Sequence, residues 1–268
     1  MPSARAGKRL EKISWKAKKA TLTFDDDEKI FLSENAFSEF RLYVGKEIPS
    51  LELRKIKDLA ALDDLYNYAL KLLSARNYTS YEIRTKLAVK CDEVESVRKV
   101  IFRLKKNGLL DDEGYARMYL EDAYDVKLIG EKKIRFELDK RGISPEIMAN
   151  LPFSYEKEVK AAKRFAGILE KRYVCVPNGA KRQKIMNSLL LRGFSHSVAN
   201  EATLEIKNNE AQDEVLLLEK EYNKAKARYA RKYQGYELRQ KLTAYLLGKG
   251  YRYEDIRNME DNGYEDDC

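Results

Sequence analysis

The sequence has very few of the residues that metal sites and nucleophilic active sites need. Its 268 residues include one histidine, His196, and three widely separated cysteines, Cys91, Cys175 and Cys268. This composition argues against zinc ribbons, redox CxxC sites, a disulfide framework and a histidine-based triad. There is also no glycine-rich phosphate loop, G-x-S-x-G or H-E-x-x-H pattern. We therefore predict a protein that is not an enzyme and binds no metal or cofactor, with Cys91 and Cys175 as buried small hydrophobes.

Proline, glycine and long apolar runs are scarce as well. Five prolines and 13 glycines are few, as expected of a mainly helical chain. No apolar run approaches the ~18–20 residues of a membrane span, and the N-terminus lacks the apolar segment of a secretory signal. Because the cysteines show no paired spacing, we expect a cytoplasmic protein in a reducing compartment.

Charged residues, in contrast, are abundant and unevenly distributed. The 52 Lys and Arg residues exceed the 44 Asp and Glu residues, which gives a net charge of +8. Residues 1–20 carry seven basic side chains and one acidic one, whereas residues 254–268 carry seven acidic and one basic. An acidic end on a basic body is usually a solvated tail, although it can also compete with an anionic partner for the basic surface.

The N-terminal region has the pattern of short strands. Apolar and polar residues alternate in residues 13–17 and 21–24, and a triple acid at 25–27 precedes a third apolar run. This alternation predicts a small antiparallel β-meander with Ala17 in its first strand. Ser33 is in position to cap a short helix that follows the third strand.

From about residue 58 the apolar period becomes helical, and one pattern occurs four times. In each copy an apolar residue is followed four positions later by another, and four positions after that by a small residue, at offsets of 51, 51 and 57 residues. A glycine at the last position can adopt the left-handed conformation that ends a helix. In the first copy Cys91 replaces glycine, so we expect that helix to end differently. The copies are Ile83, Leu87 and Cys91; Ile134, Leu138 and Gly142; Ile185, Leu189 and Gly193; and Leu242, Leu246 and Gly250.

These copies predict four three-helix repeats. One repeat cannot bury both faces of its helices, but stacked repeats can, and such stacks form solenoids. We therefore predict a mainly α fold, an elongated curved solenoid of tandem three-helix repeats with a small N-terminal antiparallel β-meander. The alternative is two unrelated helical domains whose spacing matches by coincidence. The predicted boundaries are 1–57 for the β-rich extension, 58–110, 111–152, 153–209 and 210–258 for the repeats, and 259–268 for an acidic tail.

Several polar residues are predicted to lie at helix starts. Thr79 and Glu82 have the spacing of a capping box. The acidic pairs Asp63-Asp64 and Asp111-Asp112 are expected at the first turns of helices, where carboxylates stabilise exposed N–H groups and the positive helix end. His196 is expected to be a capping or surface residue at the start of a third helix.

The second helix of every predicted repeat carries cations beside its buried stripe. Stacking would align them into a ridge suited to a polyanion or to a repetitive acidic protein surface. In one helix a plainly solvated face is the commoner meaning, but the same bias in four copies favours a binding surface. Tyrosines interleaved with cations within residues 211–233 could stack on bases, yet we favour packing between repeats. The candidate contact residues are Arg84, Lys86, Lys90, Lys132, Lys133, Arg135, Lys140, Arg141, Lys181, Arg182, Lys184, Arg192, Arg239, Lys241 and Lys249.

Four stretches of the first two repeats carry a family resemblance. They are residues 68–76 (YALKLLSAR), 78–87 (YTSYEIRTKL), 100–112 (VIFRLKKNGLLDD) and 130–143 (GEKKIRFELDKRGI). In these stretches the chain resembles the RecX family, the bacterial regulators of the recombinase RecA. The rest of the chain is similar to longer members of that family, which have an N-terminal extension and a further repeat.

The resemblance implies a function as well as a fold. It implies a non-enzymatic monomer that lies in the groove of the RecA filament on single-stranded DNA, inhibits its ATPase and strand-exchange activities, and so regulates DNA repair, recombination and the SOS response. The basic residues named above are our candidates for that contact, with direct DNA contact as a further option. Two alternatives remain: a nucleic-acid-binding repeat protein that acts without RecA, and a helical-repeat adaptor for another protein.

Overall fold

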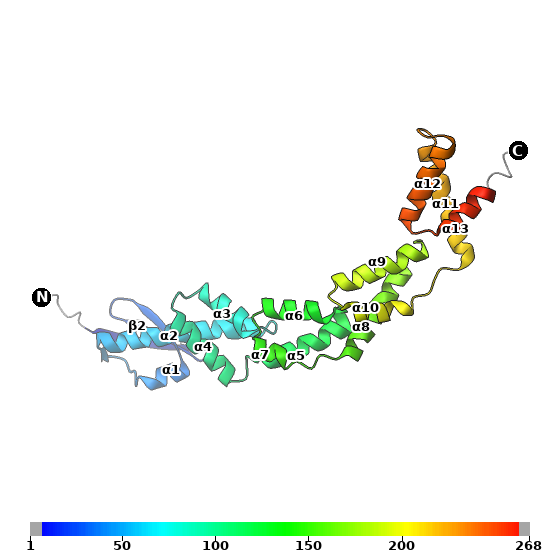
Figure 1. Ribbon diagram of the computed structural model, residues 1–268. Helices are drawn as coiled ribbons and strands as arrows, with labels where there is room; N and C mark the ends of the chain where they lie inside the picture. Colours follow the sequence, from blue (N-terminus) through cyan, green and yellow to red (C-terminus); the bar gives the residue numbers. More distant parts are fainter. Residues whose placement is uncertain (1–6, 263–268) are drawn as a thin grey trace. The chain divides into compact units, whose positions relative to one another are not determined.

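The computed structural model describes residues 7–262, which form two compact units (Figure 1). The first unit contains residues up to 115 together with 141–147, and the second contains 116–140 together with the residues from 148 onward. The division passes through two helices, α5 (Asp112–Asp122) and α7 (Pro145–Ala149).

The first unit begins with a four-stranded antiparallel sheet in the order β3-β2-β1-β4. The meander of β1 (Lys8–Lys16), β2 (Lys19–Phe24) and β3 (Lys29–Ser33) confirms the predicted antiparallel strands. The two-residue β4 (Glu47–Ile48) has no signal in the sequence, and it pairs with the start of β1. The expectation for Ala17 was wrong, because Ala17 and Lys18 both have positive φ and form the tight turn between β1 and β2, the turn geometry that suits the twist of paired strands.

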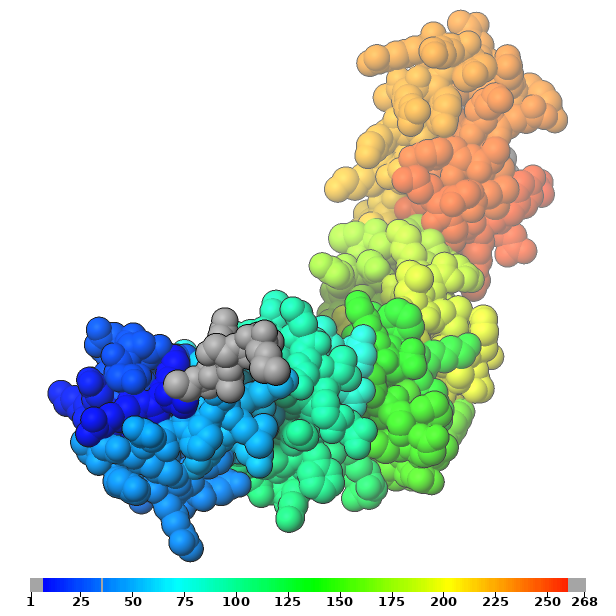
Figure 2. Space-filling view, turned by 90° about the vertical axis from the view of Figure 1, so that its left-hand side faces the viewer, coloured from blue at the N-terminus to red at the C-terminus, as the bar shows by residue number. Residues whose placement is uncertain are grey.

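Two helices follow the sheet. As predicted, Ser33 caps α1 (Glu34–Glu39), and its hydroxyl accepts a hydrogen bond from the Ala36 N–H at 3.3 Å. Helix α2 (Ser50–Leu73) begins after Pro49 and is much longer than the sequence pattern indicates. Its first turns bury Leu53 and Ile56 in the core beneath the sheet, and Figure 2 shows the dark blue N-terminal strands beside the lighter blue helix. Residue 57, the predicted end of the β-rich extension, therefore lies inside this continuous helix.

The length of α2 overturns the prediction for Asp63-Asp64, which lie in the middle of this helix and not at its start. Asp63 is buried, its carboxylate accepts a hydrogen bond from Arg103 Nη1 at 3.2 Å, and the Ser33 hydroxyl also donates to it. The pair Asp111-Asp112 was placed correctly, because α5 begins at Asp112 and Asp111 accepts a hydrogen bond from the Gly114 N–H.

The remaining elements are helical and confirm the mainly α class. We call each copy of the repeated apolar-apolar-small pattern a frame. The two apolar residues of every frame lie on the second helix of a repeat and are buried completely or almost completely. Ser195 caps α10 (His196–Leu204), so His196 is the first residue of that helix, as expected. The repeat boundaries and the curvature of the stack stay predictions. The helices are α3 (Ser80–Ala88), α4 (Val94–Lys106), α6 (Glu131–Lys140), α8 (Tyr155–Arg172), α9 (Asn178–Leu191), α10 (His196–Leu204), α11 (Ala211–Tyr229), α12 (Gly235–Lys249) and α13 (Tyr253–Asn262), with a π-helical turn η1 (Ala123–Lys127) after α5.

The cysteines and the tyrosines of α11 have different surroundings. The expectation for Cys175 was wrong because it is exposed, whereas Cys91 is half-buried. Tyr222 is partly buried against the core of α11–α13, and Tyr229 packs edge-on to Tyr245, which favours packing over base stacking for these tyrosines. Across residues 7–262 no helix is both long and apolar enough to cross a membrane. The predicted acidic tail lies largely outside the described residues, and α13 extends into its first part.

Candidate functional site

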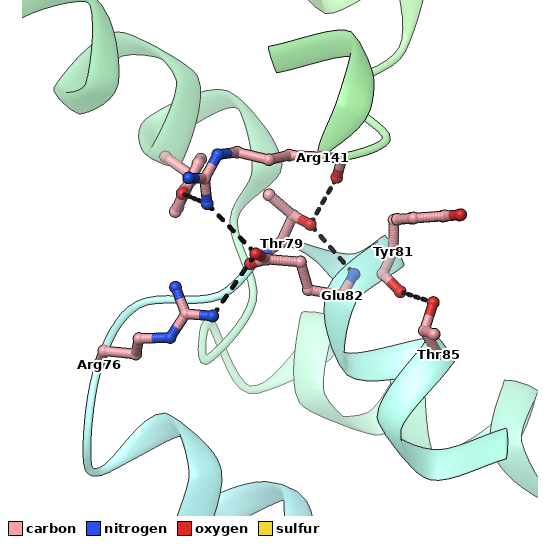
Figure 3. Close-up of polar contacts among 7 residues, drawn as sticks. Arg76, Thr79, Tyr81, Glu82, Thr85 and Arg141 are labelled. Carbon is pink, nitrogen blue, oxygen red and sulfur yellow. Dashed lines mark hydrogen bonds and ion pairs between the residues drawn. The ribbon is translucent and has the colours of Figure 1, made fainter. Parts of the chain in front are cut away.

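The first turn of α3 is held by two groups from the segment that follows it in the chain. Asp112 Oδ1 accepts a hydrogen bond from the Ser80 N–H at 2.7 Å, and the Thr79 hydroxyl donates to the Arg141 carbonyl at 2.7 Å. Thr79 and Glu82 also form the predicted capping box (Figure 3). The backbone and side-chain polar groups at the start of α3 therefore have partners both within the helix and in residues 32 and 62 positions away in sequence.

The same arrangement recurs at the start of α6 in the second unit. The Glu131 N–H donates to Glu158 Oε1 at 3.0 Å, and the Gly130 N–H donates to the Arg192 carbonyl at 3.0 Å. The start of α9 has the third example, in which the Asn178 N–H donates to Glu214 Oε1 at 3.0 Å. We call these three places the junctions. In each junction a carboxylate from the next repeat's first helix caps the preceding second helix.

A glycine from the next repeat also packs at each junction. Gly142, Gly193 and Gly250 have φ of +72°, +87° and +96°, and a Cβ on any of them would lie 2.3–2.7 Å from Cβ of Tyr81, Lys133 or Ala180. Both the left-handed backbone and the close approach therefore require glycine. The predicted role of these glycines as helix ends is confirmed, and their second role at the junctions is new.

The basic residue just before the small residue of each frame has an internal role. Arg141 Nη1 lies 2.9 Å from the Tyr115 hydroxyl, and Lys90 Nζ lies 4.4 Å from the centre of the Tyr68 ring. Figure 3 shows Arg141 directed at Glu82, to which its guanidinium donates at 3.2 Å. These cations hold the end of a second helix against neighbouring aromatic rings and carboxylates.

The equivalent residues of the third and fourth repeats behave in the same way. Arg192 lies over the Phe165 ring at 4.2 Å and donates to the Lys127 carbonyl at 2.6 Å. Lys249 Nζ is 3.4 Å from the Glu221 carboxylate. The recurrence of charge at this position, which the sequence suggested as part of a binding ridge, thus has a structural cause.

Two further candidates are also held by contacts inside the protein. Lys181 is only 5% exposed, and its ammonium donates to the Lys207 carbonyl at 3.0 Å and to Asn209 Oδ1 at 3.1 Å. Arg135 pairs with Glu131 at 2.7 Å and stacks on the Phe153 ring at 4.2 Å. Lys181 is therefore too buried to contact a partner, and Arg135 contributes mainly to packing.

The other candidates lie at the surface. Lys133, Lys184 and Lys241 each directly precede the first buried residue of their frame and are exposed, so the same position carries a cation in three successive repeats. In the first repeat this position holds Glu82, which forms the capping box. Helix α9 itself contains no acidic residue.

The remaining candidates differ in exposure. Arg84 and Lys140 are exposed, and Lys86 is half-buried beside the Tyr78 ring. We define the basic row as the exposed residues at the starts of α6, α9 and α12: Lys132, Lys133, Arg182, Lys184, Arg239 and Lys241.

The capping carboxylates of the first two junctions differ in their electrostatics. Burial alone would raise the pKa of Asp112, but hydrogen bonds from Ser80 and the Lys105 ammonium together hold that pKa below its usual range. Burial raises the pKa of Glu158 above its usual range, and its hydrogen bond from the Glu131 N–H offsets this only in part. Burial, with a contribution from Glu158, also raises the pKa of Tyr124, whose hydroxyl has no hydrogen-bond partner among the described residues.

Sequence reasoning missed the capping carboxylates and the internal partners of the cations. One signal was available, because Asp112, Glu158 and Glu214 all stand in the first turn of a first helix. Such acids are normally read as favouring their own helix start, so nothing local reveals that they cap another helix. In the described part of the chain no three His, Cys, Asp or Glu side chains gather where they could hold a metal ion. The surface that remains is suited to binding an anionic partner through the basic row.

Comparisons with known proteins place this architecture among relatives. A family model described as RecX, first three-helix domain, matches residues 66–104, and one described as RecX, third three-helix domain, matches residues 212–258. The regulatory protein RecX of Streptococcus gordonii is 31% identical over 253 residues, which cover 94% of this chain and 98% of the relative. That of Streptococcus sanguinis is 32% identical over 250 residues, or 92% of this chain and 96% of the relative.

Solved structures show the same similarity. A crystal structure of regulatory protein RecX superimposes with a TM-score of 0.62 and 26% identity, covering 74% of this chain and 100% of that chain. A crystal structure of RecX from Lactobacillus salivarius has a TM-score of 0.50 and 27% identity, covering 55% of this chain and 96% of the other.

Proposed function

The chain belongs to the RecX family of regulatory proteins, and on that premise we propose that it binds the filament formed by RecA on single-stranded DNA. In this proposal it acts as a monomer in the cytoplasm and inhibits the ATPase and strand-exchange activities of RecA. It thereby regulates DNA repair, recombination and the SOS response. The family is one of regulatory proteins and not of enzymes.

The observation that carries the proposal is the recurrence of an exposed cation at one position in three successive repeats. Lys133, Lys184 and Lys241 stand at equivalent places in α6, α9 and α12. A filament presents the same protein surface and the same phosphate backbone again at each subunit. Cations repeated with the repeats of this chain would meet such a target at several points at once, which increases both the rate and the specificity of binding.

Charge reversal in the basic row tests this contact. The variant Arg182→Glu, Lys184→Glu, Arg239→Glu, Lys241→Glu is titrated into a RecA ATPase assay on single-stranded DNA and into a strand-exchange assay. We expect the wild-type chain to inhibit at substoichiometric amounts and the variant to need at least about tenfold more protein. Circular dichroism should show equal helicity because these side chains are exposed.

A matched control carries four reversals elsewhere on the second unit, at Lys160, Lys171, Lys220 and Lys226, all of which are exposed. This control should inhibit like the wild type. If both variants lose inhibition equally, net charge and not the basic row is responsible. If the wild-type chain leaves both RecA activities unchanged, the proposed function itself is wrong.

A further inference from the structure

The outer face of the N-terminal sheet carries three cross-strand rows of side chains. Alternate residues of the strands, such as Leu22 and Phe24, are fully buried on the inner face. The residues between them therefore project from the other face of the sheet, and the strand register determines which of them stand side by side. The first row is Lys12, Thr23 and Lys29, the second is Ser14, Thr21 and Phe31, and the third is Lys16 and Lys19. Ser33 is next to Lys19 in the register, but its hydroxyl caps α1 and donates to Asp63, so it adds nothing to this face.

Positive charge on this face is largely uncompensated. Lys12, Lys16 and Lys29 are exposed, and no acidic partner is found for them among residues 7–262. Lys19 differs, because its Nζ forms an exposed ion pair with Asp64 at 3.6 Å. Lys16 and Lys19 stand directly opposite each other, a pairing of like charges that destabilises a sheet. Two rows of lysine therefore flank a central row of hydroxyl groups and one aromatic ring.

The aromatic ring distinguishes this face from an ordinary protected edge. Lysines on exposed strands by themselves prevent edge-to-edge aggregation, and β3 is one of the two edge strands of this sheet. Phe31, however, lies on that same edge strand and is 50% exposed, although an exposed ring on an edge works against such protection. Its neighbours in the row, Ser14 and Thr21, are polar, so this face provides no apolar cover for the ring.

We propose that this face binds single-stranded nucleic acid, with phosphates along the two lysine rows and a base stacked on Phe31. Proteins that bind single strands without sequence preference combine a positively charged track with an aromatic platform, and in several folds that platform is the open face of a sheet. A purely acidic protein surface would be matched by the lysines but would not use the ring. Because this binding requires no RecA, its test is independent of the filament assay.

The test uses the full chain and a short fluorescein-labelled oligothymidylate, with binding followed by fluorescence anisotropy across a range of salt. The charge variant is Lys12→Gln, Lys16→Gln, Lys29→Gln, and its matched control is Lys55→Gln, Lys99→Gln, Lys106→Gln. The control removes the same charge from exposed positions on α2 and α4 of the same unit. The ring variant is Phe31→Ala, and its control is Phe102→Ala, which removes a 68% exposed ring from α4.

We expect the sheet-face charge variant to bind at least about tenfold more weakly and to lower the salt slope by about 2, at roughly 0.7 per lost phosphate contact. Phe31→Ala should weaken binding about tenfold with an unchanged salt slope, because stacking releases no counterions. Both controls should bind within about twofold of the wild type.

Three results would overturn the proposal. The first is a wild-type chain that does not bind the oligonucleotide, and the second is an equal loss in the sheet-face variant and its charge control. The third is a Phe31→Ala variant that binds like the wild type, which would mean that the ring touches no base. Equal circular dichroism spectra for all variants show that any loss reflects the surface and not unfolding.

Discussion

Second helices of this protein end in two different ways. The segment after α9 turns through Gly193 with φ of +87° and lies against Lys133 at the start of α6. The segment after α3 reaches Cys91 without a left-handed residue at that position. Within residues 7–262 no second helix of a repeat precedes α3, so the end of α3 has no such neighbour to pack against. The neighbouring repeat, more than helix termination itself, therefore requires glycine at the later positions.

The first two junctions differ in a second respect, the titration of their capping carboxylates. Asp112 gains hydrogen bonds that favour its charged form, and its pKa is lowered. Glu158 is desolvated, and its pKa is raised. The same capping arrangement therefore shifts the pKa of its carboxylate in opposite directions at the two junctions. Burial raises a carboxylate pKa, and hydrogen bonds to the charged form lower it.

The largest effect is expected from Gly193→Ala. An added methyl group would face the Lys133 backbone N at 2.5 Å while the backbone stays left-handed, which should cost about 3 kcal/mol of unfolding free energy. Gly167→Ala, inside α8 with no atom within 4 Å of the added Cβ, should instead stabilise by up to about 1 kcal/mol. Urea unfolding measures both. Equal effects of the two substitutions would remove the special status of the junction glycine.

The next effect concerns the Glu158 cap. Glu158→Ala leaves the Glu131 N–H without its acceptor and should cost about 1–2 kcal/mol at neutral pH. Glu158→Gln keeps an oxygen acceptor and removes a buried charge, so its stability at neutral pH should be close to or above that of the wild type.

The pH dependence of this pair has a definite sign. Because the folded-state pKa of Glu158 is raised, the folded protein binds more protons than the unfolded chain between the ordinary pKa, 4.5, and the folded value. The contribution of Glu158 is therefore fully present below the ordinary pKa and is lost as pH rises through the folded one. The stability of the wild type relative to Glu158→Gln should fall with rising pH. A difference that does not change with pH would contradict the assignment.

Asp112→Asn should have a smaller effect of the opposite sign in pH. Asparagine keeps an acceptor for the Ser80 N–H but loses the Lys105 ion pair, whose 3.1 Å contact is half exposed on the lysine side, and the cost at neutral pH should be about 0.5–1 kcal/mol. Since the pKa of Asp112 is lowered, its contribution is present above the ordinary value of 3.8 and is lost as pH falls through the folded-state pKa. Thermal unfolding of both chains between neutral and acidic pH measures this difference.

Local signals were sufficient to predict most helices. The spacing of apolar residues identified the second helices, whose two apolar pattern residues are buried in every copy. Ser33 was identified as a cap because its hydroxyl accepts from the backbone three residues on. The same local reasoning failed at Asp63, which was expected at a helix start. Burial of Leu53 and Ile56 under the sheet instead extends α2 toward the N-terminus, so that it begins at Ser50. Tertiary contacts of this kind override position-specific preferences.

The candidate site was predictable only in part, for a related reason. A sequence shows that Lys181 and Lys184 are both cations on one helix, but their exposure depends on partners such as Asn209, 28 residues away. Likewise, the role of Arg192 depends on Phe165 in another helix. Charge periodicity therefore shows that the second helices are basic, but it does not separate cations that hold the repeats together from those left at the surface.

The smallest effect is expected from Cys91→Ala, just after the second helix of the first repeat. Cys91 is half-buried against the core of the first repeat, so removal of its sulfur should cost about 0.5 kcal/mol. Because α3 ends without a left-handed residue at this position, alanine introduces neither backbone strain nor a clash. The urea midpoint of this variant should lie close to that of the wild type and far above that of Gly193→Ala. A loss comparable to that of Gly193→Ala would show that the end of α3 is constrained by a neighbour after all, and the distinction between the first repeat and the later ones would fail.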